Sequence, residues 1–197
     1  MSKNVTAAGF APVMDYQLPL PALDLTRGYS HLPDASAFKG AGGYLEHRPG
    51  MYTSEIYGGV RCVHMGVDIW QEAGAPVYAF ADGKIFGARD NDNPLDYGPT
   101  IVTEHNFWDK KLYALYGHLS RESLKKFTAG DEICKGQLLG ELGTKEENGG
   151  WIPHLHFQLS VKKPDVPDMP GVVSVEDALR LASVYPDPRM VLGPLYL

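Results

Sequence analysis

Cysteines, long apolar runs and an excess of positive charge are scarce or missing in this sequence. Among 197 residues only Cys62 and Cys134 are cysteines, too few for a disulfide framework, so we expect reduced thiols. No apolar run approaches the roughly 20 residues of a membrane-spanning helix. The formal net charge of -6 argues against nucleic acid or an anionic membrane surface as the principal partner. These absences, with 44% hydrophobic residues, are typical of a soluble globular chain.

The N-terminal residues lack the apolar stretch of a secretory signal peptide. Residues 1–5 contain one lysine and begin no hydrophobic segment. If Met1 is the natural start, we expect a cytoplasmic location, with action outside the cytoplasm only if the chain is exported by another route. No feature of the sequence predicts an oligomeric state.

Long helices are not indicated either, because the chain contains 22 glycines and 15 prolines, which favour short strands joined by turns. Regular alternation begins near Tyr52 and ends near Val161, and Ser174 is placed to cap one short helix over residues 175–184. We predict a mainly β protein with an antiparallel sheet core. It consists of an irregular N-terminal arm over residues 1–50, a central domain over 51–163 and a C-terminal tail, with the short helix, packed on the core over 164–197.

Several strands are predicted from local patterns. Residues 60–70 alternate so that His64, Gly66 and Asp68 share one face of a strand. The Asp82-Gly83 pair between two apolar runs predicts a hairpin. Residues 100–105 and 111–119 are expected to pair as an antiparallel ribbon whose second strand ends near His118.

Residues 151–159 contain the pattern around which the chain is organised. His154 and His156 are two residues apart, so on a strand their imidazoles project from the same face while Leu155 and Phe157 occupy the other. Two imidazoles on one rigid strand are a common basis for a metal site or an acid–base pair.

The sequence thus offers five groups suited to metal chemistry, namely His64, Asp68, His118, His154 and His156. A catalytic zinc takes three protein ligands and keeps a fourth position for water, which would leave two groups for proton transfer. Each motif alone has a plainer explanation, since an isolated histidine on a strand is usually structural. His105 is assigned that structural role, and Tyr113 and Tyr116 are expected to be packing residues.

The conjunction of motifs carries a family resemblance. The matching segments are His64-Met65-Gly66-Val67-Asp68, Gly74-Ala75-Pro76-Val77, Ala81-Asp82-Gly83, Tyr97-Gly98, Tyr116-Gly117-His118-Leu119, Gly136-Gln137, Leu139-Gly140 and Pro153-His154-Leu155-His156-Phe157. In this order, over about half of the chain, they resemble the lysostaphin-type, LytM-like zinc metallopeptidases, most of which cut peptide bonds in bacterial peptidoglycan.

The resemblance implies roles for all five groups. His64, Asp68 and His156 would be the Zn²⁺ ligands, and His118 and His154 the catalytic pair. It also implies an antiparallel β-sheet core with the site in a groove, and a peptidoglycan cross-bridge or muropeptide as substrate. Two alternatives stay open: a metallohydrolase for a small cytoplasmic amide or ester, and a non-catalytic module that only holds a metal. An N-terminal arm that covers the groove as an autoinhibitory segment is a further hypothesis.

Overall fold

The computed structural model describes residues 9–29, 39–107 and 110–195. Residues 1–5, on which the expectation about a signal peptide depends, lie outside the described residues, as do residues 30–38 of the predicted arm.

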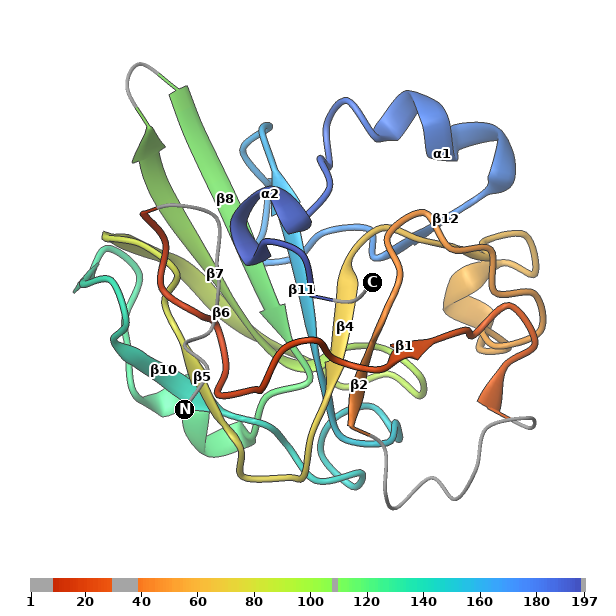
Figure 1. Ribbon diagram of the computed structural model, residues 1–197, viewed down its shortest axis with the longest axis horizontal. Helices are drawn as coiled ribbons and strands as arrows, with labels where there is room; N and C mark the ends of the chain where they lie inside the picture. Colours follow the sequence, from red (N-terminus) through yellow and green to blue (C-terminus); the bar gives the residue numbers. More distant parts are fainter. Residues whose placement is uncertain (1–8, 30–38, 108–109, 196–197) are drawn as a thin grey trace.

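The main sheet has eight strands in the described parts of the chain, in the order β1-β2-β4-β11-β8-β7-β6-β9 (Figure 1). Its strands are β1 (Ala22–Leu23), β2 (Gly40–Gly42), β4 (Val67–Trp70), β6 (Gly83–Asn91), β7 (Gly98–Phe107), β8 (Lys110–Gly117), β9 (Glu132–Ile133) and β11 (His154–Ser160). Every neighbouring pair is antiparallel except β1 and β2. The predicted mainly β fold and the pairing of β7 with β8 are confirmed.

Strand β11 lies in the middle of this sheet, and its two faces differ as predicted. Leu155, Phe157 and Leu159 are fully buried in the main hydrophobic cluster, together with Tyr116 of β8. This packing orients the alternate residues of β11, which begin with two histidines, toward the opposite face. Tyr113 is also buried, in a smaller cluster, so both tyrosines of β8 are packing residues.

The described residues also form two smaller, two-stranded sheets. Strand β5 (Pro76–Tyr78) pairs with β10 (Leu138–Glu141), and β3 (Val63–His64) pairs with β12 (Val172–Val173). The predicted hairpin at Asp82-Gly83 is therefore wrong, because β5 and β6 have different partners. Asp82 and Gly83 also lack the positive φ that a two-residue type I′ turn requires.

The helices in the described parts of the chain are short. They are α1 (Val175–Leu181), α2 (Arg189–Leu192) and the 3-10 turns η3 (Glu55–Tyr57) and η4 (Arg121–Lys125). The predicted helix after Ser174 is confirmed, and the Ser174 hydroxyl caps it by accepting a hydrogen bond from the Asp177 backbone N–H at 3.2 Å. In the described residues, no helix has the length and apolar character needed to cross a membrane.

Described segments near both ends of the chain pack against the core. Strand β2 extends the main sheet beside β4, and Met14 forms an isolated bridge with Val77 of β5. At the other end, Val191 and Leu192 of α2 are buried in the main hydrophobic cluster. The described part of the predicted arm thus supplies β1 and β2, the last two strands at one end of the main sheet, which the sequence analysis did not foresee. The division of the chain at residues 50 and 163 stays a prediction.

Candidate metal centre

His64 and Asp68 come from two strands rather than from one. The chain leaves β3 after His64, passes through Met65 and Gly66, and enters β4, which carries Asp68. The single predicted strand over residues 60–70 is therefore interrupted. A Cβ atom at Gly66 would lie 2.5 Å from Cε1 of His156, so glycine is needed here to make room for that imidazole.

Strand β11 brings the second pair of histidines to the same place. His156 lies opposite Asp68 of β4 and opposite Gly117 of β8 in the two antiparallel ladders that flank it. His154 lies opposite Trp70, and the two rings stack with centroids 5.1 Å apart and an angle of 22° between their planes. The central strand of the sheet therefore holds both imidazoles between rigid neighbours.

His118 enters the site from a strained turn at the end of β8. Its φ of 63° is in the left-handed region, which a residue with a Cβ adopts only at a cost. The backbone is held by the N–H of His118, which donates to Tyr97 O at 3.0 Å, and by the N–H of Gly143, which donates to His118 O at 2.9 Å. The turn brings the His118 ring centroid within 4.2 Å of that of His154. Strain of this kind is concentrated at functional sites.

Hydrogen bonds assign the tautomers of the two histidines nearest Asp68. Nδ1 of His64 lies 2.9 Å from the carbonyl oxygen of Gly43, which only accepts, so Nδ1 carries the proton. Nε2 of His156 lies 3.0 Å from Oε1 of Gln158, whose amide nitrogen is oriented toward Pro170 O. Nε2 therefore carries the His156 proton. The other ring nitrogens, Nε2 of His64 and Nδ1 of His156, are left with lone pairs.

These two lone pairs face each other and an Asp68 oxygen. Nε2 of His64 lies 2.9 Å from Nδ1 of His156, and Oδ1 of Asp68 lies 3.1 Å from the first nitrogen and 3.0 Å from the second. Three acceptors without a hydrogen between them repel one another unless a cation lies among them. Ligands of a tetrahedral zinc, bound at about 2.0–2.1 Å, are roughly 3.3 Å apart, so the spacing and the donor types fit this metal.

The charge state of the group also suits a cation. Burial and the nearby Arg48 charge lower the pKa of His64 to about 4, against the opposing effect of Asp68, so its imidazole is neutral at pH 7. Burial alone would raise the pKa of Asp68, but its histidine neighbours and Arg48 hold it well below its ordinary value. A carboxylate and a neutral imidazole are the forms in which these two groups bind metal ions.

His118 and His154 form a second pair beside this group. Nδ1 of His118 donates to Asn148 O at 2.9 Å, and Nδ1 of His154 donates to Ile152 O at 2.7 Å. Burial lowers the pKa of both imidazoles, so each is neutral at pH 7 with its lone pair on Nε2. Nε2 of His154 is 3.8 Å from Oδ1 of Asp68. The pair can therefore accept protons next to the group of three acceptors.

All five residues line one cavity of about 350 Å³. Its walls include the aromatic residues Tyr29, Tyr52, Tyr57, Tyr97 and Trp151. The sequence analysis did not identify Arg48, which also lines this cavity, or Gln158, which orients His156. Gln158 could have been found, because it follows His156 by two residues on the same strand face. Arg48 lies in the predicted irregular arm, where no periodicity marks it.

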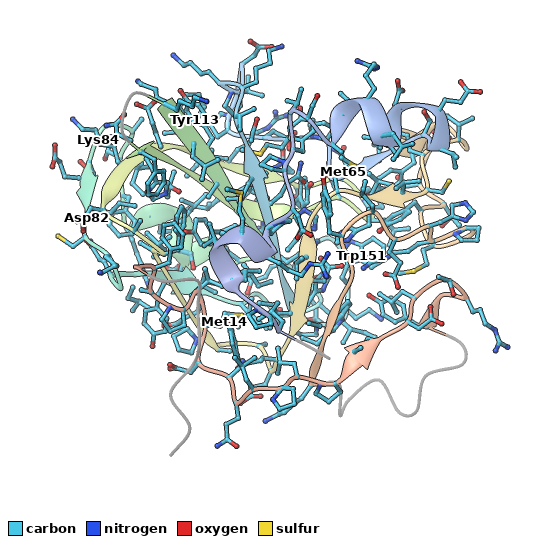
Figure 2. All side chains as sticks on the ribbon, turned by 45° about the horizontal axis from the view of Figure 1, so that its top comes forward. Met14, Met65, Asp82, Lys84, Tyr113 and Trp151 are labelled. Carbon is cyan, nitrogen blue, oxygen red and sulfur yellow. The ribbon has the colours of Figure 1, made fainter. Side chains whose placement is uncertain are left out.

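His105 lies elsewhere, as its predicted structural role requires. Its Nδ1 donates to Asp82 O at 2.9 Å and its Nε2 lies 2.7 Å from the Thr103 hydroxyl, so both ring nitrogens are satisfied. Figure 2 shows Asp82 at the far side of the molecule from Trp151, which lines the cavity.

The profile of Peptidase family M23 matches residues 62–167. The chain is 32% identical over 116 residues to the peptidoglycan DD-endopeptidase ShyB of Vibrio cholerae, covering 59% of this chain and 25% of that protein. It is 34% identical over 112 residues to the glycyl-glycine endopeptidase ALE-1 of Staphylococcus capitis, covering 55% and 27%.

Among solved structures, the catalytic domain of lysostaphin from Staphylococcus simulans aligns with a TM-score of 0.48 and 25% identity, covering 72% of this chain and 92% of that one. The chain spans about a quarter of the length of the curated relatives it matches. The family profile extends over more than half of the chain and includes all five clustered residues. This chain belongs to Peptidase family M23.

Proposed function

We propose that this chain is a zinc-dependent metallopeptidase that hydrolyses amide bonds of peptidoglycan, in cross-bridges or in muropeptides. The observation that carries the proposal is the convergence of three lone-pair atoms, from the buried residues His64, Asp68 and His156, beside two neutral imidazoles that line the same cavity. Membership of Peptidase family M23 and the peptidoglycan and glycyl-glycine endopeptidases among its relatives support the choice of substrate.

In this proposal His64, Asp68 and His156 hold the zinc through Nε2, Oδ1 and Nδ1. Zinc bound there would act as a Lewis acid and would lower the pKa of a bound water molecule to about 7. Gly43 and Gln158 keep the two imidazoles in the tautomers that bind metal, by accepting the protons on their other nitrogens.

His118 and His154 are proposed as the proton-transfer pair. Their Nε2 atoms are unprotonated at neutral pH and so can accept a proton from the attacking water and later deliver it to the leaving amine. The hydrogen bonds from Nδ1 to Asn148 O and Ile152 O keep both rings oriented throughout. The Asp68 charge, 3.8 Å from Nε2 of His154, favours the protonated form of that ring when the proton arrives.

The size of the cavity is compatible with a peptide that is only partly enclosed. Its volume of about 350 Å³ lies near the lower end of the range of about 300–1,000 Å³ found for ligand pockets. A short stretch around the scissile amide would fit inside, between the aromatic walls, and the rest of the substrate would continue outside. This arrangement supports a polymeric or oligomeric substrate such as a muropeptide.

The test is hydrolysis of a panel of muropeptides and oligoglycines by zinc-loaded and chelator-stripped protein, with products identified by mass spectrometry. We expect cleavage only by the zinc-loaded protein. His154→Ala should abolish turnover and keep stoichiometric zinc, while Arg180→Ala, at an exposed position of α1 outside the cavity, serves as a control with both properties intact.

Other outcomes would redirect the assignment. Loss of zinc in His154→Ala would make His154 a ligand. Stoichiometric zinc without turnover of any substrate would favour a non-catalytic metal-holding module. Cleavage of small amides or esters but not of muropeptides would favour the small-molecule hydrolase.

A further inference from the structure

Arg48 contacts the proposed metal ligand Asp68 from outside the region that matches the family profile. Its side chain is only 2% exposed. Nη1 donates to Oδ2 of Asp68 at 2.6 Å, and Nε donates to Oε2 of Glu46 at 2.6 Å. Burying a guanidinium and two carboxylates costs desolvation free energy, which is offset only when the charges are well paired. We therefore expect this arrangement to have a function beyond stability.

We propose that Arg48 is a positioning residue for the metal centre. Its side chain holds Asp68 so that only Oδ1 of the carboxylate faces the ion. The inference rests on the proposed function, since it assumes that Asp68 binds the metal. Oδ1 of Asp68 lies among the two histidine nitrogens, whereas Oδ2 is occupied by Arg48. A free carboxylate could rotate or offer both oxygens, and the hydrogen bond to Arg48 prevents both.

The position of Arg48 is itself fixed by the fold. Glu46, which binds Nε of Arg48, accepts the backbone N–H of Leu25 at 2.9 Å with its other oxygen. Tyr52 contributes its hydroxyl at 3.2 Å from Nη1. A Cβ at Gly42 would lie 2.8 Å from Nη2 of Arg48, so glycine at that position of β2 leaves room for the guanidinium. The guanidinium is therefore held by Glu46 and Tyr52 in addition to its hydrogen bond to Asp68.

Residues 43–48, the segment that contains Arg48, are hydrogen-bonded to the strand that carries His64. The N–H of Leu45 donates to His64 O at 2.9 Å, the N–H of His64 donates to Glu46 O at 3.0 Å, and the N–H of Arg48 donates to Cys62 O at 2.7 Å. Since Gly43 O also accepts the Nδ1 proton of His64, residues 43–48 orient two of the three proposed ligands. This part of the predicted arm supports the metal centre, which is a different role from the autoinhibitory cover suggested by the sequence.

The proposal is tested by the zinc dissociation constant, measured by chelator competition. Arg48→Met should weaken zinc binding about 10- to 100-fold, the effect typical of losing an outer partner of a ligand. Arg48→Lys, which keeps the charge but cannot contact both carboxylates in the same way, should recover part of the loss. Arg180→Met, which removes an exposed arginine from α1, is the matched control and should bind zinc like the wild type.

A double variant separates positioning from general stability. If Arg48 acts through Asp68, Arg48→Met should weaken zinc binding no further in an Asp68→Ala background. Wild-type zinc affinity in folded Arg48→Met, or in Arg48→Lys if the former does not fold, would overturn the proposal. An equal loss in the Asp68→Ala background would overturn it as well. Absence of zinc binding by the wild type would instead contradict the proposed function itself.

Discussion

Nε2 of His64 lies 2.9 Å from Nδ1 of His156, and the hydrogen bonds on the far sides of both rings place no proton between them. This contact is unfavourable without a cation, because two lone pairs and the adjacent Asp68 oxygen face one another. We therefore expect removal of zinc to lower the midpoint of thermal unfolding. Zinc at 1,000 times its dissociation constant should restore about 4.1 kcal/mol of stability. Calorimetry over a zinc titration measures this shift, and a midpoint that does not depend on zinc would contradict the prediction.

Gln158 is expected to influence zinc binding although it is not a proposed ligand. Gln158→Leu removes the acceptor of the His156 Nε2 proton, so the ring can take the tautomer with its proton on Nδ1. We expect zinc affinity to fall about 10- to 100-fold. Gln158→Glu, which keeps an acceptor at this position, is the control and should retain tight binding in the same chelator competition.

Gly66→Ala should displace His156 and thereby weaken the binding of zinc. The added methyl group would lie 2.5 Å from Cε1 of His156, and both residues are held in strands or at strand ends. Metal analysis of the purified variant should show less than stoichiometric zinc. Gly87→Ala is a matched control, since its methyl group would approach Pro167 equally closely at 2.5 Å but no proposed ligand. It should lower stability and keep zinc.

The backbone at His118 allows strain and chemistry to be separated. His118→Ala and His118→Gly should both lose turnover and keep zinc, because each removes an imidazole proposed for proton transfer. At a φ of 63°, however, glycine avoids a penalty of about 1–2 kcal/mol that alanine incurs. Chemical denaturation should therefore find His118→Gly more stable than His118→Ala. The reverse order would show that the turn is not strained.

His105 should make stability depend on pH. Burial lowers the pKa of His105 below its ordinary value of 6.5, so between these two pKa values the unfolded chain binds more protons than the folded one. Stability contributed by the neutral ring is present above pH 6.5 and is lost as the pH falls, by about 1.4 kcal/mol per pH unit until the folded-state pKa is reached. Denaturation of zinc-loaded protein at several pH values should show a steeper decline than for His105→Gln. Parallel curves would contradict this assignment.

The strand patterns show what local sequence could predict. His154 and His156 share a face because side chains alternate along any strand, and the apolar residues between and after them identify the buried face without knowledge of the rest of the chain. The ribbon of β7 and β8 was predictable because a short connection favours antiparallel pairing. The pairing of β5 with β10 was not, because these strands lie about sixty residues apart and meet only when the core is assembled.

The candidate metal centre also has features that the sequence predicts and features that it does not. Residue types and order, read with the family resemblance, identified the five groups, and the structure brings all of them to one cavity. Their assigned roles stay predictions. Spacing could not reveal that the tautomers of His64 and His156 are set by Gly43 O and Gln158, because hydrogen bonds of that kind depend on distances between separate elements.

The sequence by itself determined which side chains could do the chemistry and which face of β11 would carry two of them. Only the tertiary structure decided how they are held. Asp68, for example, accepts a hydrogen bond at 2.6 Å from the guanidinium of Arg48, which lies twenty positions earlier in a segment with no periodic pattern. Local periodicity follows from backbone geometry, whereas this contact exists because residues 43–48 are hydrogen-bonded alongside β3, and that pairing depends on the whole fold.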